Sequence, residues 1–306
     1  MSTTLNSGID PASFSAVTGP AQDLFRYVNG PWIDMYRLPD DRSRYGSFDK
    51  LAEDAENQIR EILEDDDCPA EKSHALYASF LDVDAINASG LAAIERQLEA
   101  IDAAASKTEL TRALGAMNPA GGPDLIGIAV YGDPGAPETN IIHVEQAGLG
   151  LPDEAYYRED HYAPIREAYV DMVAKQLKNA KLAADSEQAE ADAKRFLDVE
   201  TRIAANHWDN VATRDSVKTY NPTDYAEFSA MLADYDLNTW IDAWQTAYDQ
   251  TSAAQVQPLD FRGIFNHVIV HEPSFLTGLN AFWKAADLDD LKLWARVHVI
   301  IGSALE

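Results

Sequence analysis

The sequence is short of cysteine and of long apolar runs, and each shortage excludes a class of protein. A single cysteine, Cys68, allows no disulfide within the chain. No run of 18 apolar residues is present, so no segment is predicted to span a membrane. The first twenty residues have neither a basic start nor an apolar core and do not resemble a signal peptide. We therefore expect a cytoplasmic protein with no membrane partner.

Basic residues are also scarce. The 306 residues include 24 Lys and Arg against 51 Asp and Glu, which gives a net charge of −27. A surface of this sign repels phosphate backbones, so we expect no nucleic-acid partner. Hydrophobic residues nevertheless make up 46% of the chain, which excludes a disordered acidic tail. An acidic mimic of nucleic acid has only the charge in its favour, because the acidic residues are dispersed among helical segments.

Apolar residues recur at spacings of three and four over most of the chain, which predicts a mainly α-helical fold. We interpret these apolar stripes as core. A short helix is expected to end near Asn29 and Gly30, and Asn221 with Pro222 is expected to start another. Asp185 followed by Gln188 resembles a capping box. The clearest further helices are expected at residues 48–63, 165–177, 196–203, 273–286 and 288–301.

One segment has a different character. Residues 125–131 are apolar and β-branched, residues 132–137 are rich in Gly and Pro, and a second apolar run follows at 140–145. This pattern predicts a β-hairpin near residues 125–145. Residues 268–270, Val-Ile-Val, suggest another short strand.

A search for catalytic patterns finds none. A zinc peptidase helix often carries His-Glu-x-x-His, but only His271 is followed by Glu, and Phe275 stands where the second His belongs. His267 and His271 lie four apart on an expected strand, too far apart to share a metal. We interpret His207 as a structural, hydrogen-bonded histidine. The sequence predicts no catalytic residue, no metal ligand and no cofactor within this chain.

Six segments, taken together and in order, point to a family. They are DLFRYVNGPW at 23–32, SRYGSFD at 43–49, LYASFLD at 76–82, QAGLGLPD followed by Tyr-Tyr at 146–157, ETRIA at 200–204, and Arg-Asp with Tyr-Asn at 214–221. This series resembles the first half of the neprilysin-like (M13) zinc metallopeptidases, whose members are about twice as long. The chain also stops about one turn after a helical stripe, so we expect a fragment of a longer protein.

The resemblance implies a multi-helix lobe of a two-lobed peptidase that encloses peptide substrates. It implies a flexible lead-in at 1–20, a segment at 21–60 that packs with an absent catalytic lobe, and a mainly helical non-catalytic lobe at 61–306. Zinc and the His-Glu-x-x-His motif are expected in the missing C-terminal half, and apolar patches are expected to be exposed where that half packs. The chain alone is expected to be inactive. The absence of an anchor and of disulfides points to a bacterial-type member.

The same resemblance suggests a substrate-binding group at Arg44, Phe48 and Asp49. In relatives the matching Arg binds a carboxylate at the C-terminal side of the substrate, a task that suits guanidinium geometry. Phe48 would line the pocket and Asp49 would orient Arg44. A second Arg, eight residues later in mammalian members, is Ala52 here. Two alternatives remain open: a surface ion pair for Arg44, and a standalone helical peptide-binding or scaffolding module for the whole chain.

Overall fold

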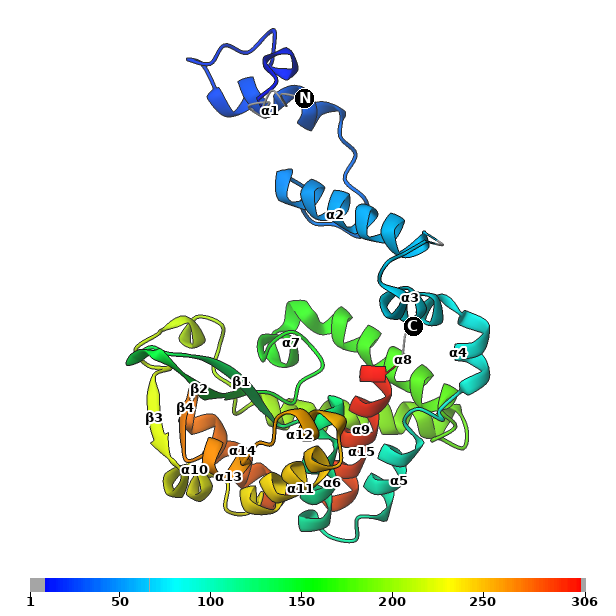
Figure 1. Ribbon diagram of the computed structural model, residues 1–306, viewed down its shortest axis with the longest axis vertical. Coiled ribbons are helices and arrows are strands. Elements are labelled where there is room, and N and C mark those ends of the chain that lie inside the picture. The colour runs from blue at the N-terminus through cyan, green and yellow to red at the C-terminus, as the bar shows by residue number, and fades with distance from the viewer. Residues whose placement is uncertain (1–8, 66, 304–306) are drawn as a thin grey trace. The chain divides into compact units, whose positions relative to one another are not determined.

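The computed structural model describes residues 9–65 and 67–303 and confirms the mainly helical fold (Figure 1). The chain forms two compact units, Met1–Ala88 and Ser89–Glu306. The boundary expected after residue 60 concerns the lobes of a longer protein and stays a prediction. Within residues 9–65 and 67–303, no helix is both long enough and apolar enough to cross a bilayer.

The first unit is a succession of helices. They are α1 (Leu24–Met35), α2 (Ser47–Glu64), α3 (Glu71–Leu81) and α4 (Val83–Ser89), the last of which ends at the start of the second unit.

Helix α1 does not end at Gly30, as the sequence suggested, but continues through Pro31 to Met35. A proline has no N–H, so the carbonyl four residues earlier, that of Tyr27, loses its helical donor. Here the N–H of Ser15 donates to that carbonyl at 2.7 Å. The helix can therefore continue because a residue outside it replaces the missing hydrogen bond. The N-terminus of α1 is capped by Asp23, which accepts the N–H of Arg26 at 2.9 Å.

Helix α2 confirms the helix expected at 48–63, but its apolar stripe is not core. Phe48 is 88% exposed, and Leu51, Ile59 and Ile62 are also exposed. Spacing of three and four defines a common helix face, whereas burial depends on what packs against that face. The interpretation of this stripe as core is therefore wrong for the unit described here.

The second unit contains the main hydrophobic core. Its largest fully buried side chains include Phe196, Trp240, Trp283 and Trp294. Its helices are α5 (Glu95–Ala103), α6 (Lys107–Met117), α7 (Ala155–Arg158), α8 (Ala163–Asn179), α9 (Ser186–Ala204), α10 (Tyr225–Met231), α11 (Leu237–Asp249), α12 (Ser252–Val256), α13 (Phe261–Ile264), α14 (Pro273–Ala285) and α15 (Leu288–Ser303).

A four-stranded sheet lies at one end of this unit (Figure 1). Its strands are β1 (Ile126–Asp133), β2 (Ala136–Gln146), β3 (Asn221–Asp224) and β4 (His267–Val270), in the order β1-β2-β4-β3. β1 and β2 form the predicted antiparallel hairpin, and β4 is the predicted short strand. β4 pairs parallel to β2 and antiparallel to β3. Both strand predictions are confirmed.

The helix start expected at Asn221 is wrong. Asn221 and Pro222 belong to β3, and helix α10 begins three residues later, capped by Asp224, which accepts the N–H of Glu227. The Asn221 side chain donates to the carbonyl of Val270 at 2.9 Å, so it anchors the strand rather than a helix. Pairing with β4 has overridden the local capping preference.

Candidate functional site

The predicted substrate-binding residues lie at the start of α2. Arg44 is exposed, and within residues 9–65 and 67–303 it makes no ion pair or side-chain hydrogen bond. Phe48 is exposed as well. Asp49 does not pair with Arg44; its Oδ2 atom accepts the N–H of Gly46 at 2.7 Å, at the first turn of the helix. Arg44 thus lies just before α2, Phe48 and Asp49 lie in its first turn, and the Arg44 side chain is accessible.

The backbone before α2 is held by its neighbours. The Tyr45 hydroxyl donates to Glu53 at 2.7 Å, and Arg42 pairs with the other oxygen of Glu53 at 3.2 Å. The hydrogen bond to Glu53 raises the pKa of Tyr45. The Tyr45 ring also stacks on Tyr36, with ring centroids 4.6 Å apart, and Tyr36 stacks on Trp32 at 4.7 Å. These contacts fix Tyr45 and Arg42 on either side of Arg44, and the sequence reading missed the pairing with Glu53.

A buried polar network in the second unit was also missed. Glu200 on α9 is fully buried. Its Oε1 atom accepts the Gly150 N–H at 2.8 Å and lies 2.9 Å from Nε2 of His298 on α15. Its Oε2 atom accepts the Tyr157 hydroxyl at 2.9 Å. Burial, followed by the nearby Glu200 carboxylate, raises the pKa of Tyr157 and of Tyr169. An available signal was the position of Glu200, one turn after Phe196 on the apolar face of its helix.

The loop between β2 and α7, residues 147–154, is held by Glu200 through Gly150 and by two further side chains. The Ala147 carbonyl lies 3.0 Å from Nε2 of His207. Burial lowers the pKa of His207 to about 4, so the ring is neutral at pH 7 and donates from Nε2. The Gly148 carbonyl accepts the indole N–H of Trp294 at 3.0 Å. The prediction that His207 is structural and hydrogen-bonded agrees with this geometry.

Gly148 has a conformation that favours glycine. Its φ is +94°, and a Cβ atom there would lie 2.9 Å from Cδ2 of Leu125. The loop is therefore held through main-chain groups of Ala147, Gly148 and Gly150, which have side-chain partners in His207, Trp294 and Glu200. It provides positioning rather than a reacting group.

A pair of histidines bridges β2 and the end of β4. Nδ1 of His143 lies 2.8 Å from Nε2 of His271, and Glu145 lies 3.9 Å from the same atom of His271. Burial lowers the pKa of His271. Next to it, burial raises the pKa of Glu272 to about 7, although its Oε2 atom accepts the Gln146 N–H at 3.0 Å.

His267, which the sequence placed on a strand too far from His271 to share a metal with it, is exposed at the other end of β4. Over the described parts of the chain, no group of three or more His, Cys, Asp or Glu side chains is placed to hold a metal ion.

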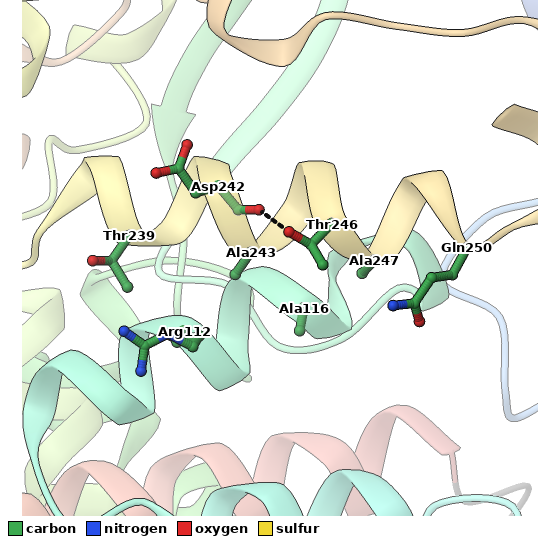
Figure 2. A pocket seen from close by; sticks show the side chains of 8 residues that line it. All are labelled: Arg112, Ala116, Thr239, Asp242, Ala243, Thr246, Ala247 and Gln250. Atoms are coloured by element: carbon green, nitrogen blue, oxygen red, sulfur yellow. Dashed lines mark hydrogen bonds between the residues drawn. The ribbon is translucent and has the colours of Figure 1, made fainter.

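A shallow hollow of about 360 Å³ lies between α6 and α11 (Figure 2). Ala116, Ala243 and Ala247 line it, with Arg112 on one side and Asp242 on the other. Asp242 is already paired with Arg262 at 2.8 Å. Its two hydroxyl groups are engaged within α11 and its N-terminal cap: Thr239 donates to the Asp236 carboxylate at 2.6 Å, and Thr246 donates to the Asp242 carbonyl at 2.8 Å.

Comparisons with known proteins place these observations in context. The sequence profile of peptidase family M13 matches residues 20–305. Human neprilysin is 25% identical over 319 aligned residues, which cover 95% of this chain and 42% of neprilysin. Among solved structures, the zinc metalloprotease Zmp1 of Mycobacterium tuberculosis, in complex with an inhibitor, is 31% identical with a TM-score of 0.81 over 96% of this chain and 43% of that one. PepO from Lactobacillus rhamnosis is 21% identical with a TM-score of 0.70 over 93% and 43% of the two chains, a likeness of fold. The chain thus spans less than half the length of these relatives.

Proposed function

Because this chain belongs to peptidase family M13, we propose that it is the non-catalytic, substrate-enclosing N-terminal part of a zinc metalloendopeptidase that hydrolyses peptides. The observation that carries the proposal is the family match over residues 20–305 in a chain that spans about 42% of neprilysin. The chain itself has no His-Glu-x-x-His sequence. The described residues offer no metal-binding group either, so no catalytic step is assigned to them. In this proposal zinc is held by residues outside this chain.

The exposed surface of the first unit supports a role in assembly. Phe48, Leu51, Ile59 and Ile62 present one apolar face of α2 to solvent. Contiguous exposed apolar surface is typical of a binding surface, because water disfavours it. We propose that residues 21–60 pack against the catalytic part of the complete protein, as the resemblance implied.

Arg44 is the residue of this chain that we propose for substrate binding. Its exposed guanidinium stands beside a backbone fixed by Tyr45 and Asp49, so it can present two parallel N–H donors to a carboxylate. In the complete protein it would bind the carboxylate at the C-terminal side of a peptide, with Phe48 against the adjacent side chain.

We further propose that the complete protein is bacterial and lies in the cytoplasm. Cell fractionation with an antibody against residues 89–306 would test that location.

The deciding experiment begins with the coding sequence after the codon for Glu306. We expect an in-frame His-Glu-x-x-His, a full-length protein with one tightly bound zinc, and zinc-dependent cleavage of a fluorogenic peptide. Residues 1–306 alone are expected to cleave nothing. A stop codon after residue 306, with a native product near 34 kDa, would instead favour the standalone peptide-binding module. Tight stoichiometric zinc with peptidase activity in residues 1–306 would contradict the proposal.

A further inference from the structure

Three stacked aromatic rings join helix α1 to the start of α2. Trp32 on α1 stacks on Tyr36, the residue after the end of that helix, with ring centroids 4.7 Å apart. Tyr36 stacks in turn on Tyr45, which lies just before α2, with centroids 4.6 Å apart. Aromatic pairs at such distances are stabilised beyond the area that they bury. This aromatic stack, Trp32–Tyr36–Tyr45, therefore links the two helices.

The hydroxyl end of Tyr45 is held by α2. It donates to Oε2 of Glu53 at 2.7 Å, and a hydrogen bond to an ionised carboxylate is among the stronger kinds. Oε1 of Glu53 pairs with Arg42 at 3.2 Å, but both side chains of this ion pair are partly exposed, so it contributes little. Tyr45 is thus half-buried and held at both its ring and its hydroxyl, whereas the neighbouring Arg44 is exposed.

These contacts fix the main chain next to Arg44. A planar peptide unit joins Arg44 to Tyr45, so fixing Tyr45 limits where the Cα atom of Arg44 can lie. On the far side of Tyr45, the N–H of Gly46 donates to Asp49 at 2.7 Å, and the Gly46 carbonyl accepts the N–H of Lys50 at 3.1 Å. Ordering a backbone costs conformational entropy, and a segment that is ordered in advance does not lose it on binding.

The same contacts keep two carboxylates engaged away from Arg44. Glu53 accepts the Tyr45 hydroxyl, and Asp49 accepts the Gly46 N–H. In a chain with a net charge of −27, acidic neighbours are the obvious competitors for an exposed guanidinium. A carboxylate that already accepts a hydrogen bond elsewhere has less to gain from Arg44, which favours a carboxylate supplied by a ligand.

We propose that Tyr36 and Tyr45 are positioning residues for carboxylate binding by Arg44: the aromatic stack and the Tyr45–Glu53 hydrogen bond hold the Arg44 backbone in place before the substrate binds. Helix α1 then contributes to recognition without contacting the substrate. This inference rests on the proposed substrate-binding role of Arg44, but the positioning itself can be measured on residues 1–306.

The first measurement is amide hydrogen exchange in residues 1–306, followed by mass spectrometry. Tyr36→Leu removes the middle ring of the aromatic stack, whereas Tyr45→Phe keeps the ring and removes the hydroxyl. Because the backbone is then less restrained, we expect exchange in residues 42–47 to become about fivefold faster or more in each variant.

Two matched controls make the same changes elsewhere in the first unit. Tyr27→Leu removes a ring of α1 that packs on Phe14, with centroids 5.1 Å apart. Tyr77→Phe removes a hydroxyl that donates to Glu64 at 3.0 Å. We expect either control to change exchange in residues 42–47 by less than about twofold. Exchange like that of its control in Tyr36→Leu or in Tyr45→Phe would overturn the positioning, independently of any activity.

The second measurement uses the complete protein. For a peptide with a free C-terminal carboxylate, we expect Tyr36→Leu and Tyr45→Phe each to raise KM by about fivefold or more, with kcat nearly unchanged. The amidated peptide should be nearly unaffected. The double variant of Arg44→Gln and Tyr45→Phe should match Arg44→Gln alone, because Tyr45 acts through Arg44.

The outcomes separate this inference from the proposed function. An effect of Arg44→Gln on the peptide with the free carboxylate, with no effect of Tyr45→Phe, would overturn the positioning and leave the role of Arg44 intact. Equal effects of Tyr45→Phe on both peptides, or an undiminished effect in the double variant, would show a merely structural role and overturn it as well. No effect of Arg44→Gln on either peptide would contradict the proposed role of Arg44 and this inference with it.

Discussion

The carboxylate of Glu200 lies 2.9 Å from Nε2 of His298, although the two residues are 98 positions apart. This distance is that of a hydrogen bond between the carboxyl group and the imidazole ring. The pair joins α9 to α15, and the same Oε1 atom accepts the Gly150 N–H. One buried side chain thus ties two helices and a loop together.

Removal of this carboxylate should therefore be costly. Glu200→Ala leaves the Gly150 N–H, the Tyr157 hydroxyl and His298 without their acceptor. We expect the free energy of unfolding of residues 1–306 to fall by about 3–5 kcal/mol, as for other broken buried pairs. Urea unfolding followed by circular dichroism measures this. Glu200→Gln, which keeps the volume and one acceptor oxygen, should lose clearly less; equal losses would show that the second carboxylate oxygen or its charge, and not the retained acceptor, carries the stabilisation.

Gly148 allows a test of the loop conformation. At φ +94° a side chain strains the backbone, and a Cβ atom would contact Leu125. We expect Gly148→Ala to lower the free energy of unfolding by about 1–3 kcal/mol. Gly132→Ala is the matched control, because nothing lies within 4 Å of its added Cβ and its φ is not positive. A smaller effect at position 148 than at position 132 would contradict this account.

His207 should make the second unit sensitive to acid. Burial lowers its pKa to about 4, so an unfolded chain binds its proton at higher pH than the folded one. The part of the free energy of unfolding that depends on a neutral His207 is complete above pH 6.5 and is lost as the pH falls towards 4. The loss should approach about 3 kcal/mol for a shift of this size.

The measurement compares urea unfolding at pH 7 with unfolding at pH 4.5. His207→Gln, which can still donate to the Ala147 carbonyl, should show a smaller loss of stability than the parent chain. His267→Gln, at an exposed histidine, should behave like the parent. If the parent and His207→Gln lose stability equally, His207 is not the residue responsible.

If Arg44 binds the substrate carboxylate in the complete protein, its substitution should change KM only for peptides with a free C-terminal carboxylate. A purely structural residue would affect both kinds of peptide. With Arg44→Gln we expect KM to rise by about tenfold or more for a peptide with a free C-terminal carboxylate, since a hydrogen bond to a charged group contributes about 1.5–3 kcal/mol. The amidated peptide should be nearly unaffected. Arg42→Gln is the control, because Arg42 is already paired with Glu53. Equal effects on both peptides would favour the surface ion-pair alternative.

Substitutions of Phe48 and Phe196 should change the free energy of unfolding by very different amounts. Phe48 is 88% exposed, so Phe48→Ser should change the stability of residues 1–306 by less than about 0.5 kcal/mol. Phe196 is 1% exposed, and Phe196→Ala should cost about 3–5 kcal/mol. A large loss from Phe48→Ser in residues 1–306 would mean that α2 packs within this chain.

The sequence predicted correctly the elements that are determined by residues close together in the chain. The hairpin at 126–146 has alternating apolar residues around a Gly-Pro turn, and α9 has the Asp185 cap that its sequence suggested. The failures arose where a distant residue decides the outcome. Pro31 does not end α1 because Ser15 replaces the lost hydrogen bond, and Asn221 is not a helix cap because β4 pairs with it.

The same distinction between local and distant partners applies to the candidate site. Arg44, Phe48 and Asp49 could be named from a contiguous motif, although their binding role stays a prediction. The Glu200 network and the His143–His271 pair could not be named, because their members come from segments between 43 and 128 residues apart. Only the charged residue within the apolar stripe of α9 hinted at a partner, and spacing alone does not identify which one.

The parallel pairing of β2 with β4 also constrains the order of folding. Ile142 pairs with Val268, so a long stretch of chain must be ordered or closed into a loop before this ladder forms. During synthesis the β1–β2 hairpin can form early, whereas the second half of the sheet has to wait until residue 270 has left the ribosome. Non-local pairing of this kind slows folding and leaves strand edges exposed in the meantime. The newly made hairpin therefore spends an interval with both of its edges open, a state in which strand edges can pair with other chains.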